Sequence, residues 1–320
     1  YGSSPQPTAD RRADSSDSAA SEPSSAPAPA DSSATSAPAQ DNSDGASEQS
    51  RDRGGERIHV ATDLLEIELS PQGGGIVTAR LKEHTISADN PEPFTLMSAS
   101  APAFTAQIGL SSQDASAPGH TGNWSAPQQN YELKASDDQL VVPLRWTAPD
   151  GTEVLRRYTF RRDSYVINVD HQITNKGDDE RSYFQYTRLL REPTSGDQAF
   201  LGARSFIGGV ISRPDEPYTK YDFDDISDGA FDQTVTNGWV AMIQHYFLAA
   251  VIPTRDEGYR IATNRAGEGR ILGTYSPVTR VPAGGTSELA TRLFVGPKEQ
   301  DRLDAVADDL QLTVDYGWFH

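Results

Sequence analysis

The chain has 320 residues, no cysteine and a formal net charge of −18 at pH 7. The missing thiols exclude disulfides, thiolate nucleophiles and cysteine-based metal sites. The negative charge argues against nucleic acid or anionic lipid as the main partner. It indicates either a solubilising acidic surface or a host adapted to high salt. No run of about 18 apolar residues occurs, so the sequence predicts no membrane span.

Residues 1–55 are rich in Ser, Ala, Pro and Asp and contain almost no large apolar residue after Tyr1. Such a segment cannot bury enough surface to offset its conformational entropy. We therefore expect a disordered leader that acts as a tether.

From Ile58 onward the hydrophobic pattern has mostly a period of two. Between Tyr165 and Thr174, apolar residues and His171 alternate with mainly polar residues, which is typical of a strand with one buried face. Val154–Arg161 is also strand-like, and Arg162-Asp163-Ser164 is expected to join the two strands in a hairpin.

Further strands are expected along the chain, the first two joined by a turn at Pro71-Gln72-Gly73-Gly74-Gly75. They are Leu64–Leu69, Ile76–Leu81, Leu140–Trp146, Ser182–Leu189, Trp239–Ile243, Tyr246–Ile252 and Leu289–Val295. Trp239–Ile243 and Tyr246–Ile252 are almost wholly apolar, which suits strands covered on both faces. Many strands without intervening helices predict an all-β protein, a large β-sandwich over residues 56–296.

Gly296-Pro297 is expected to end the last strand and to start a helix. Leu303, Val306 and Leu310 follow at helical spacing and should pack against the sandwich. Residues 297–320 are then a helical linker and an exit from the domain. The aromatic residues Tyr316, Trp318 and Phe319 suit a membrane interface, although an ordinary C-terminal strand is an equal alternative.

No motif supplies recognisable catalytic chemistry, and we expect no catalytic residue, no metal site and no cofactor. The six histidines form no close ligand pair, and His171 and His245 are expected to be core residues within strands. The glycine turn lacks the residues of a phosphate loop. The acidic cluster Asp222, Asp224, Asp225, Asp228 does not fit a calcium loop and is expected to be a solvated loop.

Several stretches together resemble the first, large periplasmic domain of the YidC membrane protein insertases of Gram-negative bacteria. They are Thr62–Leu65 with Gly73-Gly74, Pro214–Asp224, Asn237–Phe247, Ile252-Pro253, Phe294–Pro297 and Leu312–Trp318. The resemblance covers about residues 56–320. Asn237 and Pro217 depart from the residues common in the family. Residues 111–129 have no clear counterpart there and are expected to form a variable loop.

The resemblance implies a non-catalytic domain with the β-supersandwich fold of galactose mutarotase-like proteins. It also implies a place on the periplasmic face of the inner membrane, within a multi-pass protein that inserts and folds nascent inner-membrane proteins. The implied partners are SecF and the Sec translocon. The region implicated in SecF contact matches about Phe206–Gly238, and its candidate residues are Asp215, Glu216, Tyr218, Lys220, Tyr221, Asp222, Phe223 and Asp224.

The alternative hypothesis is a carbohydrate-binding or mutarotase-like sugar-active domain, which rests on fold analogy alone. Epimerisation of a sugar needs an acid and a base that face each other across a cleft. A mutarotation assay with common aldoses separates the two hypotheses.

Overall fold

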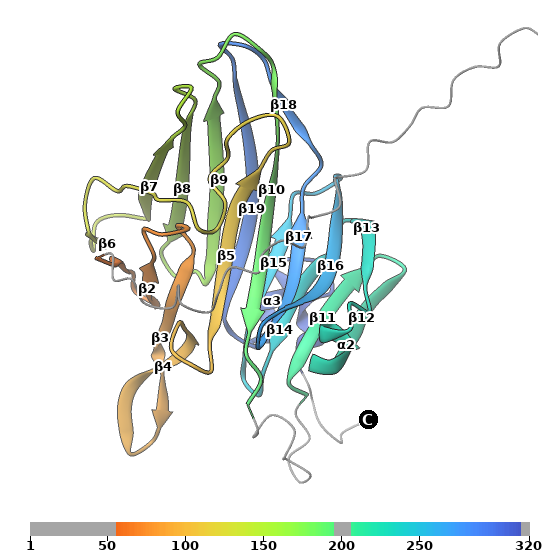
Figure 1. Ribbon diagram of the computed structural model, residues 1–320. Coiled ribbons are helices and arrows are strands. Elements are labelled where there is room, and N and C mark those ends of the chain that lie inside the picture. Colours follow the sequence, from red (N-terminus) through yellow and green to blue (C-terminus); the bar gives the residue numbers. More distant parts are fainter. Residues whose placement is uncertain (1–55, 195–205, 315–320) are drawn as a thin grey trace, which may run out of the picture. The chain divides into compact units, whose positions relative to one another are not determined.

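The computed structural model describes residues 56–194 and 206–314, so the expected tether at 1–55 and the aromatic exit at 316–319 lie outside the described residues. Within the described residues, eleven strands form one sheet and eight form a second sheet that faces it (Figure 1). The expected large β-sandwich is thereby confirmed.

The larger sheet has the strand order β13-β16-β17-β10-β5-β4-β3-β2-β1-β6, with β18 paired to β10. Its strands in chain order are β1 (Ile58–Ala61), β2 (Leu65–Leu69), β3 (Ile76–Ser87), β4 (Asn90–Ser98), β5 (Phe104–Ser111), β6 (Asn130–Glu132), β10 (Arg181–Arg191), β13 (Asp232–Thr236), β16 (Gly258–Ala266), β17 (Gly269–Tyr275) and β18 (Thr279–Val281).

The smaller sheet has the order β12-β11-β14-β15-β19-β9-β8-β7 and is antiparallel throughout. Its strands are β7 (Gln139–Thr147), β8 (Glu153–Arg161), β9 (Val166–Thr174), β11 (Gly208–Arg213), β12 (Glu216–Tyr221), β14 (Trp239–Ile243), β15 (Phe247–Pro253) and β19 (Thr286–Pro297). The helical pieces are α2 (Phe223–Ser227), α3 (Gln300–Asp304) and the 3₁₀ turn η2 (Leu310–Thr313).

Alternation of side chains decides which face of each strand meets the core. In β8 and β9, every second residue is buried, and the two strands pair from Phe160↔Ile167 to Glu153↔Thr174. The hairpin between them turns at Asp163, which takes a left-handed conformation with φ of 51°. The period-two pattern thus predicted this hairpin correctly.

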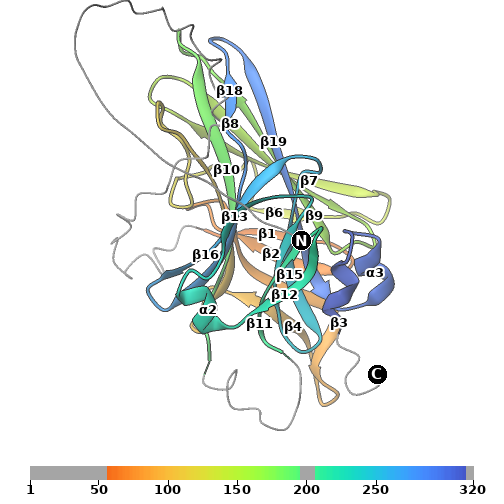
Figure 2. The same ribbon diagram turned by 90° about the vertical axis from the view of Figure 1, so that its right-hand side faces the viewer.

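β14 and β15 are buried along their whole length, as the two apolar runs predicted. One face of the smaller sheet packs on the larger sheet, and the segment after β19 covers part of the other face. Figure 2 shows α3 at the right-hand side of the sandwich, and the indole Nε1 of Trp239 in β14 donates to the carbonyl of Asp308 at 2.9 Å.

The turn between β2 and β3 depends on glycine. Gly73 and Gly74 have φ of 87° and 65°, a region that residues with a Cβ rarely occupy. The Ser70 N–H donates to the carbonyl of Gly75 at 3.0 Å and closes the turn. The expected tight hairpin turn is confirmed.

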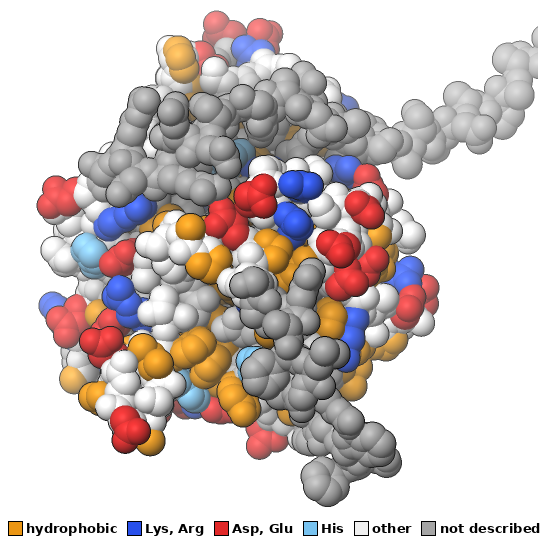
Figure 3. Space-filling view, turned by 60° about the horizontal axis from the view of Figure 1, so that its bottom comes forward, with side chains coloured by type: hydrophobic (Ala, Val, Ile, Leu, Met, Phe, Trp, Pro, Cys, Tyr) orange, Lys and Arg blue, Asp and Glu red, His pale blue; other side chains and the backbone are white. Residues whose placement is uncertain are grey.

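β3 and β4 form a long hairpin that extends below the sandwich in Figure 1. Phe94 of this hairpin stacks on Phe247 at 4.2 Å between ring centroids, next to the turn between β14 and β15. His245 lies exposed in that turn, so its expected place inside a buried strand is wrong. Tyr246 is 76% exposed and Ile86 is 55% exposed. Figure 3 brings the bottom of the Figure 1 view forward and shows hydrophobic side chains among charged ones on this face.

The last strand, β19, ends at Pro297, as Gly296-Pro297 predicted, although both residues are still paired with β15. The Lys298 N–H donates to the carbonyl of Tyr246 at 2.8 Å, so the nitrogen of Pro297 faces the opposite side of the strand. β9 has not yet begun on that side, because its first residue, Val166, pairs with Phe294. The proline therefore removes no ladder hydrogen bond.

The segment after β19 is two short pieces, α3 and η2, instead of one continuous helix. Glu299 makes no side-chain cap, and Asp309 has a left-handed φ of 65° that interrupts the helical path. Asp304 also stands at the C-terminal end of α3, where the helix dipole disfavours a carboxylate. Within the described residues, no helix has the length and apolar character needed to cross a membrane.

Candidate functional site

The stretch that the sequence singled out for partner contact lies at an edge of the smaller sheet. β12 pairs with β11 alone among the described strands, from Gly209↔Tyr221 to Arg213↔Glu216 with one irregularity. An edge strand presents backbone N–H and C=O groups that a partner strand can use. Pro217 of this strand has no backbone N–H to donate.

The eight candidate residues differ in exposure. Asp215, Glu216, Lys220, Asp222 and Asp224 are exposed, whereas Tyr218 and Tyr221 are partly buried. Phe223 is buried, with 5% of its surface accessible, and its ring lies 5.6 Å from the Arg191 guanidinium. Seven of the eight residues therefore reach the surface, and Phe223 anchors the segment from inside.

The acidic cluster that follows β12 is solvated, as expected, but it forms a short helix instead of a loop, with Asp222 at the N-cap and Asp228 at the C-cap. The Asp222 carboxylate accepts hydrogen bonds from the backbone N–H groups of Asp224 and Asp225, at 2.9 and 2.8 Å. The Asp225 carboxylate accepts in return from the Asp222 N–H at 3.2 Å, which completes a capping box. Carboxylates in a first helical turn also interact favourably with the helix dipole. Ile226, fully buried, fixes α2 against the sandwich.

Two aromatic rings flank Lys220, the cation of the candidate stretch. The Lys220 ammonium lies 5.2 Å from the ring centre of Phe206 and 5.7 Å from that of Tyr218. Tyr221 meets Phe231 edge-to-face at 5.9 Å, and burial raises the pKa of its hydroxyl. The arrangement offers backbone groups, a lysine beside two aromatic rings and several exposed carboxylates, which suits recognition of a protein surface.

The three residues of the expected linker helix join the core of the sandwich. Leu303 and Leu310 are fully buried, and Val306 is partly buried against the same core. The Arg302 guanidinium donates to the Asp163 carboxylate at 3.0 Å and lies 5.2 Å from the Tyr165 ring. The segment is thus fastened to the hairpin between β8 and β9 and to β14.

Inside the sandwich, a buried arginine connects the two sheets. Arg156 of β8 donates through Nη1 to the carbonyl of Gly73 and through Nη2 to that of Ile108, both at 3.0 Å. Its Nε donates to Nε2 of His171 at 2.7 Å, and its guanidinium lies 4.1 Å from the Trp124 ring. No carboxylate among the described residues pairs with it, and burial lowers its pKa. Sequence reasoning did not identify this arginine.

His171 is a core histidine, as expected, and it is fully buried. Because its Nε2 accepts from Arg156, the hydrogen-bond network assigns the ring proton to Nδ1. Burial, followed by the charge of Arg156, lowers the pKa of His171 well below 6.5. The imidazole therefore serves as a neutral acceptor for a buried cation.

This histidine predicts a pH dependence of stability. Near pH 6 and below, the unfolded chain protonates His171 and the folded protein does not, so folding must release a proton. The contribution of neutral His171 to the free energy of unfolding is complete above about pH 6.5. It is lost as the pH falls towards the folded-state pKa, and the free energy of unfolding then changes by up to about 1.4 kcal/mol per pH unit. Urea unfolding of the parent protein and of His171→Gln between pH 7.5 and 5 measures this pH dependence of the free energy of unfolding. The glutamine keeps an acceptor but does not titrate, so equal pH slopes would contradict the assignment.

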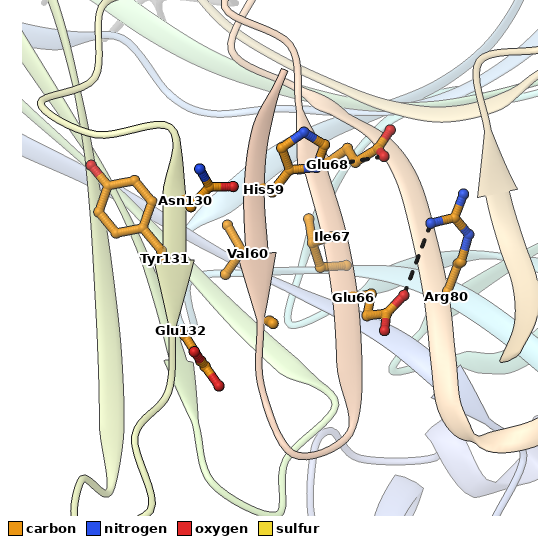
Figure 4. A pocket seen from close by; sticks show the side chains of 10 residues that line it. His59, Val60, Glu66, Ile67, Glu68, Arg80, Asn130, Tyr131 and Glu132 are labelled. Atoms are coloured by element: carbon orange, nitrogen blue, oxygen red, sulfur yellow. Dashed lines mark ion pairs between the residues drawn. The ribbon is translucent and has the colours of Figure 1, made fainter. Parts of the chain in front are cut away.

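A pocket of about 400 Å³ lies over β1, β2, β3 and β6 (Figure 4). Its charged groups face one another across neighbouring strands: Glu66 lies 3.9 Å from Arg80, and His59 lies 3.6 Å from Glu68. Such cross-strand pairs are typical of a solvated sheet surface. Among the residues with described positions, no group of three His, Asp or Glu side chains could hold a metal ion.

Comparison with known proteins identifies relatives over most of the chain. The family model described as the YidC periplasmic domain matches residues 57–320. The membrane protein insertase YidC of Alkalilimnicola ehrlichii is 41% identical over 82% of this chain and 47% of its own length. That of Marinobacter nauticus is 35% identical over 85% of this chain and 49% of its own length.

The chain thus spans about half the length of the curated relatives it matches. Among solved structures, a galactose mutarotase-like protein from Lactobacillus casei is similar with a TM-score of 0.49 and 13% identity. The match covers 75% of this chain and 99% of that protein.

Proposed function

Because the chain belongs to the family of YidC periplasmic domains, whose model matches residues 57–320, we propose that it is a non-catalytic docking domain of a membrane protein insertase. The full-length protein would insert and fold nascent inner-membrane proteins, with or without the Sec translocon. The domain would work on the periplasmic face of the inner membrane. The 41% identity to a protein named as an insertase carries this proposal.

The partner that we propose for the domain itself is SecF, bound at the edge formed by β12 and α2. Three features of this edge support the proposal. β12 has a free side among the described strands, Lys220 is held out by two aromatic rings, and five of the eight candidate residues are exposed. Phe223 and Ile226 keep the edge rigid because both are buried. Nascent chains would be partners of the full-length insertase.

Photocrosslinking in membranes tests this docking. A photoreactive residue at Glu216 or Lys220 of the full-length protein should crosslink to SecF, because both side chains are exposed on the strand that would meet it. The same probe at Arg280 of β18 serves as the control, since its side chain is 74% exposed and belongs to the other sheet. Crosslinks from Glu216 and Lys220 to nascent chains alone, or equal SecF yields from all three positions, would contradict docking through β12.

A further inference from the structure

A hollow of about 690 Å³ on the smaller sheet is lined by a cluster of polar side chains from three neighbouring strands. Thr159 of β8 pairs with Asn168 of β9, and Asn168 pairs with Arg292 of β19, so the three residues form a row across the sheet. Arg161 lies two residues beyond Thr159, and its side chain therefore leaves β8 on the same face. Strand pairing thus brings two arginines, an amide and a hydroxyl to one place.

These four side chains have no polar partner in the part of the chain that the structure describes. Neither a hydrogen bond nor an ion pair engages the side chain of Arg161, Thr159, Asn168 or Arg292. A guanidinium only donates hydrogen bonds, and amide and hydroxyl groups can donate as well. The cluster therefore offers a set of unused donors to a ligand that accepts several hydrogen bonds.

The charge of the hollow is opposite to that of the protein. Arg161, Arg255 and Arg292 line it together with one carboxylate, Asp170, whereas the whole chain has a net charge of −18. Arg255 has a partner in Asp308 at 3.3 Å. Among residues 56–194 and 206–314, no carboxylate forms an ion pair with Arg161 or Arg292. The hollow is therefore a local positive site on an acidic molecule.

Arg292 is the cation that an anionic ligand would stabilise most. Its side chain is partly buried, and burial, followed by the nearby charge of Arg255, lowers the pKa of its guanidinium. Asp170 does not offset this, because the charged neighbours that affect the pKa of Asp170 are Arg157 and Glu288. An anion in contact with Arg292 would favour the charged guanidinium and oppose both effects.

The dimensions of the cluster indicate a compact ligand. Arg161 and Arg292 lie two strands and two residues apart, so their Cα atoms are roughly 12 Å from each other. An extended arginine side chain places its guanidinium about 6 Å from Cα, from ordinary bond lengths. Both guanidiniums can therefore reach one group held over Asn168. A tetrahedral oxyanion suits this place, because it has enough oxygens for two guanidiniums and an amide, whereas a carboxylate has only two.

We propose that this hollow binds a single phosphate group between Arg161 and Arg292, with the amide of Asn168 and the hydroxyl of Thr159 as further donors. Arg255 adds positive charge in the same hollow. The site lies away from the β12 edge, because β11, β14 and β15 separate β12 from β19 in the sheet. It does not depend on docking of SecF, so either proposal can fail alone.

Nuclear magnetic resonance of the arginine side chains tests the site with inorganic phosphate as the probe. The Nε–Hε signals of Arg161 and Arg292, identified by their absence in Arg161→Gln and Arg292→Gln, should shift and saturate with a dissociation constant on the order of 1 mM. Sodium chloride at equal ionic strength should not shift them. Arg292→Gln should raise the dissociation constant about tenfold, because it removes charge-assisted hydrogen bonds. Arg161→Gln together with Arg292→Gln should abolish binding, which phosphorus resonance of the phosphate measures.

Arg280→Gln is the matched control, since it removes an equal charge from an exposed site on β18. It should bind phosphate like the parent protein, and circular dichroism should show that all variants are folded. An equal loss of binding in Arg280→Gln, undiminished binding in the double variant, or equal shifts with chloride would overturn the proposal.

Vesicles that contain phosphatidate distinguish two sources of the phosphate group. Binding of inorganic phosphate, together with vesicle sedimentation that needs Arg161 and Arg292, would support the site and identify a lipid headgroup as its ligand. Binding of inorganic phosphate without sedimentation would support the site and identify a soluble phosphate compound. Sedimentation with the vesicles without any response to inorganic phosphate would contradict the proposal.

Discussion

Replacing Arg156 with methionine should lower the free energy of unfolding by about 3 kcal/mol or more, among the largest effects of a single substitution in this domain. The side chain donates to two backbone carbonyls and one imidazole, and all three acceptors are buried. Each unsatisfied buried acceptor costs about 1–3 kcal/mol. Relief of the desolvated charge offsets part of this cost, but methionine also leaves empty volume beside Trp124.

Chemical denaturation of the isolated domain measures this effect. Arg280→Met is the matched control, because this arginine is exposed on β18 and its loss should change stability by no more than about 0.5 kcal/mol.

Gly74→Ala should also lower the free energy of unfolding, as Arg156→Met does. A Cβ on Gly74 would lie 2.6 Å from Nη1 of Arg156, and the backbone φ of 65° disfavours alanine. Equal stabilities of Arg156→Met and Arg280→Met would show that the buried arginine does not hold the sheets together.

The second large effect is expected from the segment after β19. Leu303→Ala and Leu310→Ala should each destabilise the domain by about 2–5 kcal/mol, because both side chains are fully buried and alanine leaves a cavity. In the full-length protein, aspartate at Leu303, Val306 and Leu310 should impair membrane insertion more than deletion of residues 5–50. The physical reason is that an uncompensated carboxylate cannot stay in this core.

Leu312→Asp gives a control within the same segment. Leu312 belongs to η2 like Leu310, but 44% of its surface is exposed, so the same change of charge should be nearly neutral. Insertion of a radiolabelled membrane protein into inverted vesicles, together with unfolding of the isolated domain, measures both properties. Equal, small effects of the triple variant and of the 5–50 deletion would contradict a structural role for the segment.

Local sequence pattern was sufficient for much of the fold. The alternation from Tyr165 to Thr174, the glycine turn before Ile76 and the apolar runs of β14 and β15 predicted strands, a hairpin and central positions that the structure confirms. A pattern of this kind depends only on which face of a strand is buried. The relatives at 35–41% identity confirm the family that the resemblance indicated.

Where several local signals competed, the sequence was not sufficient. The spacing of Leu303, Val306 and Leu310 predicted one helix, yet burial of the two leucines needs only two short turns. His245 fitted an apolar run and nevertheless lies in a turn.

The sequence by itself determined the sandwich and the family. Only the tertiary structure decided that β12 is an edge strand, that Arg156 joins the two sheets, and that Arg161 and Arg292 share one groove. The physical reason is that the two groups of properties depend on residues at different separations along the chain. Alternation and turn chemistry act between residues close in the chain, whereas an edge, a buried cation or a charged groove arises where strands distant in sequence become neighbours.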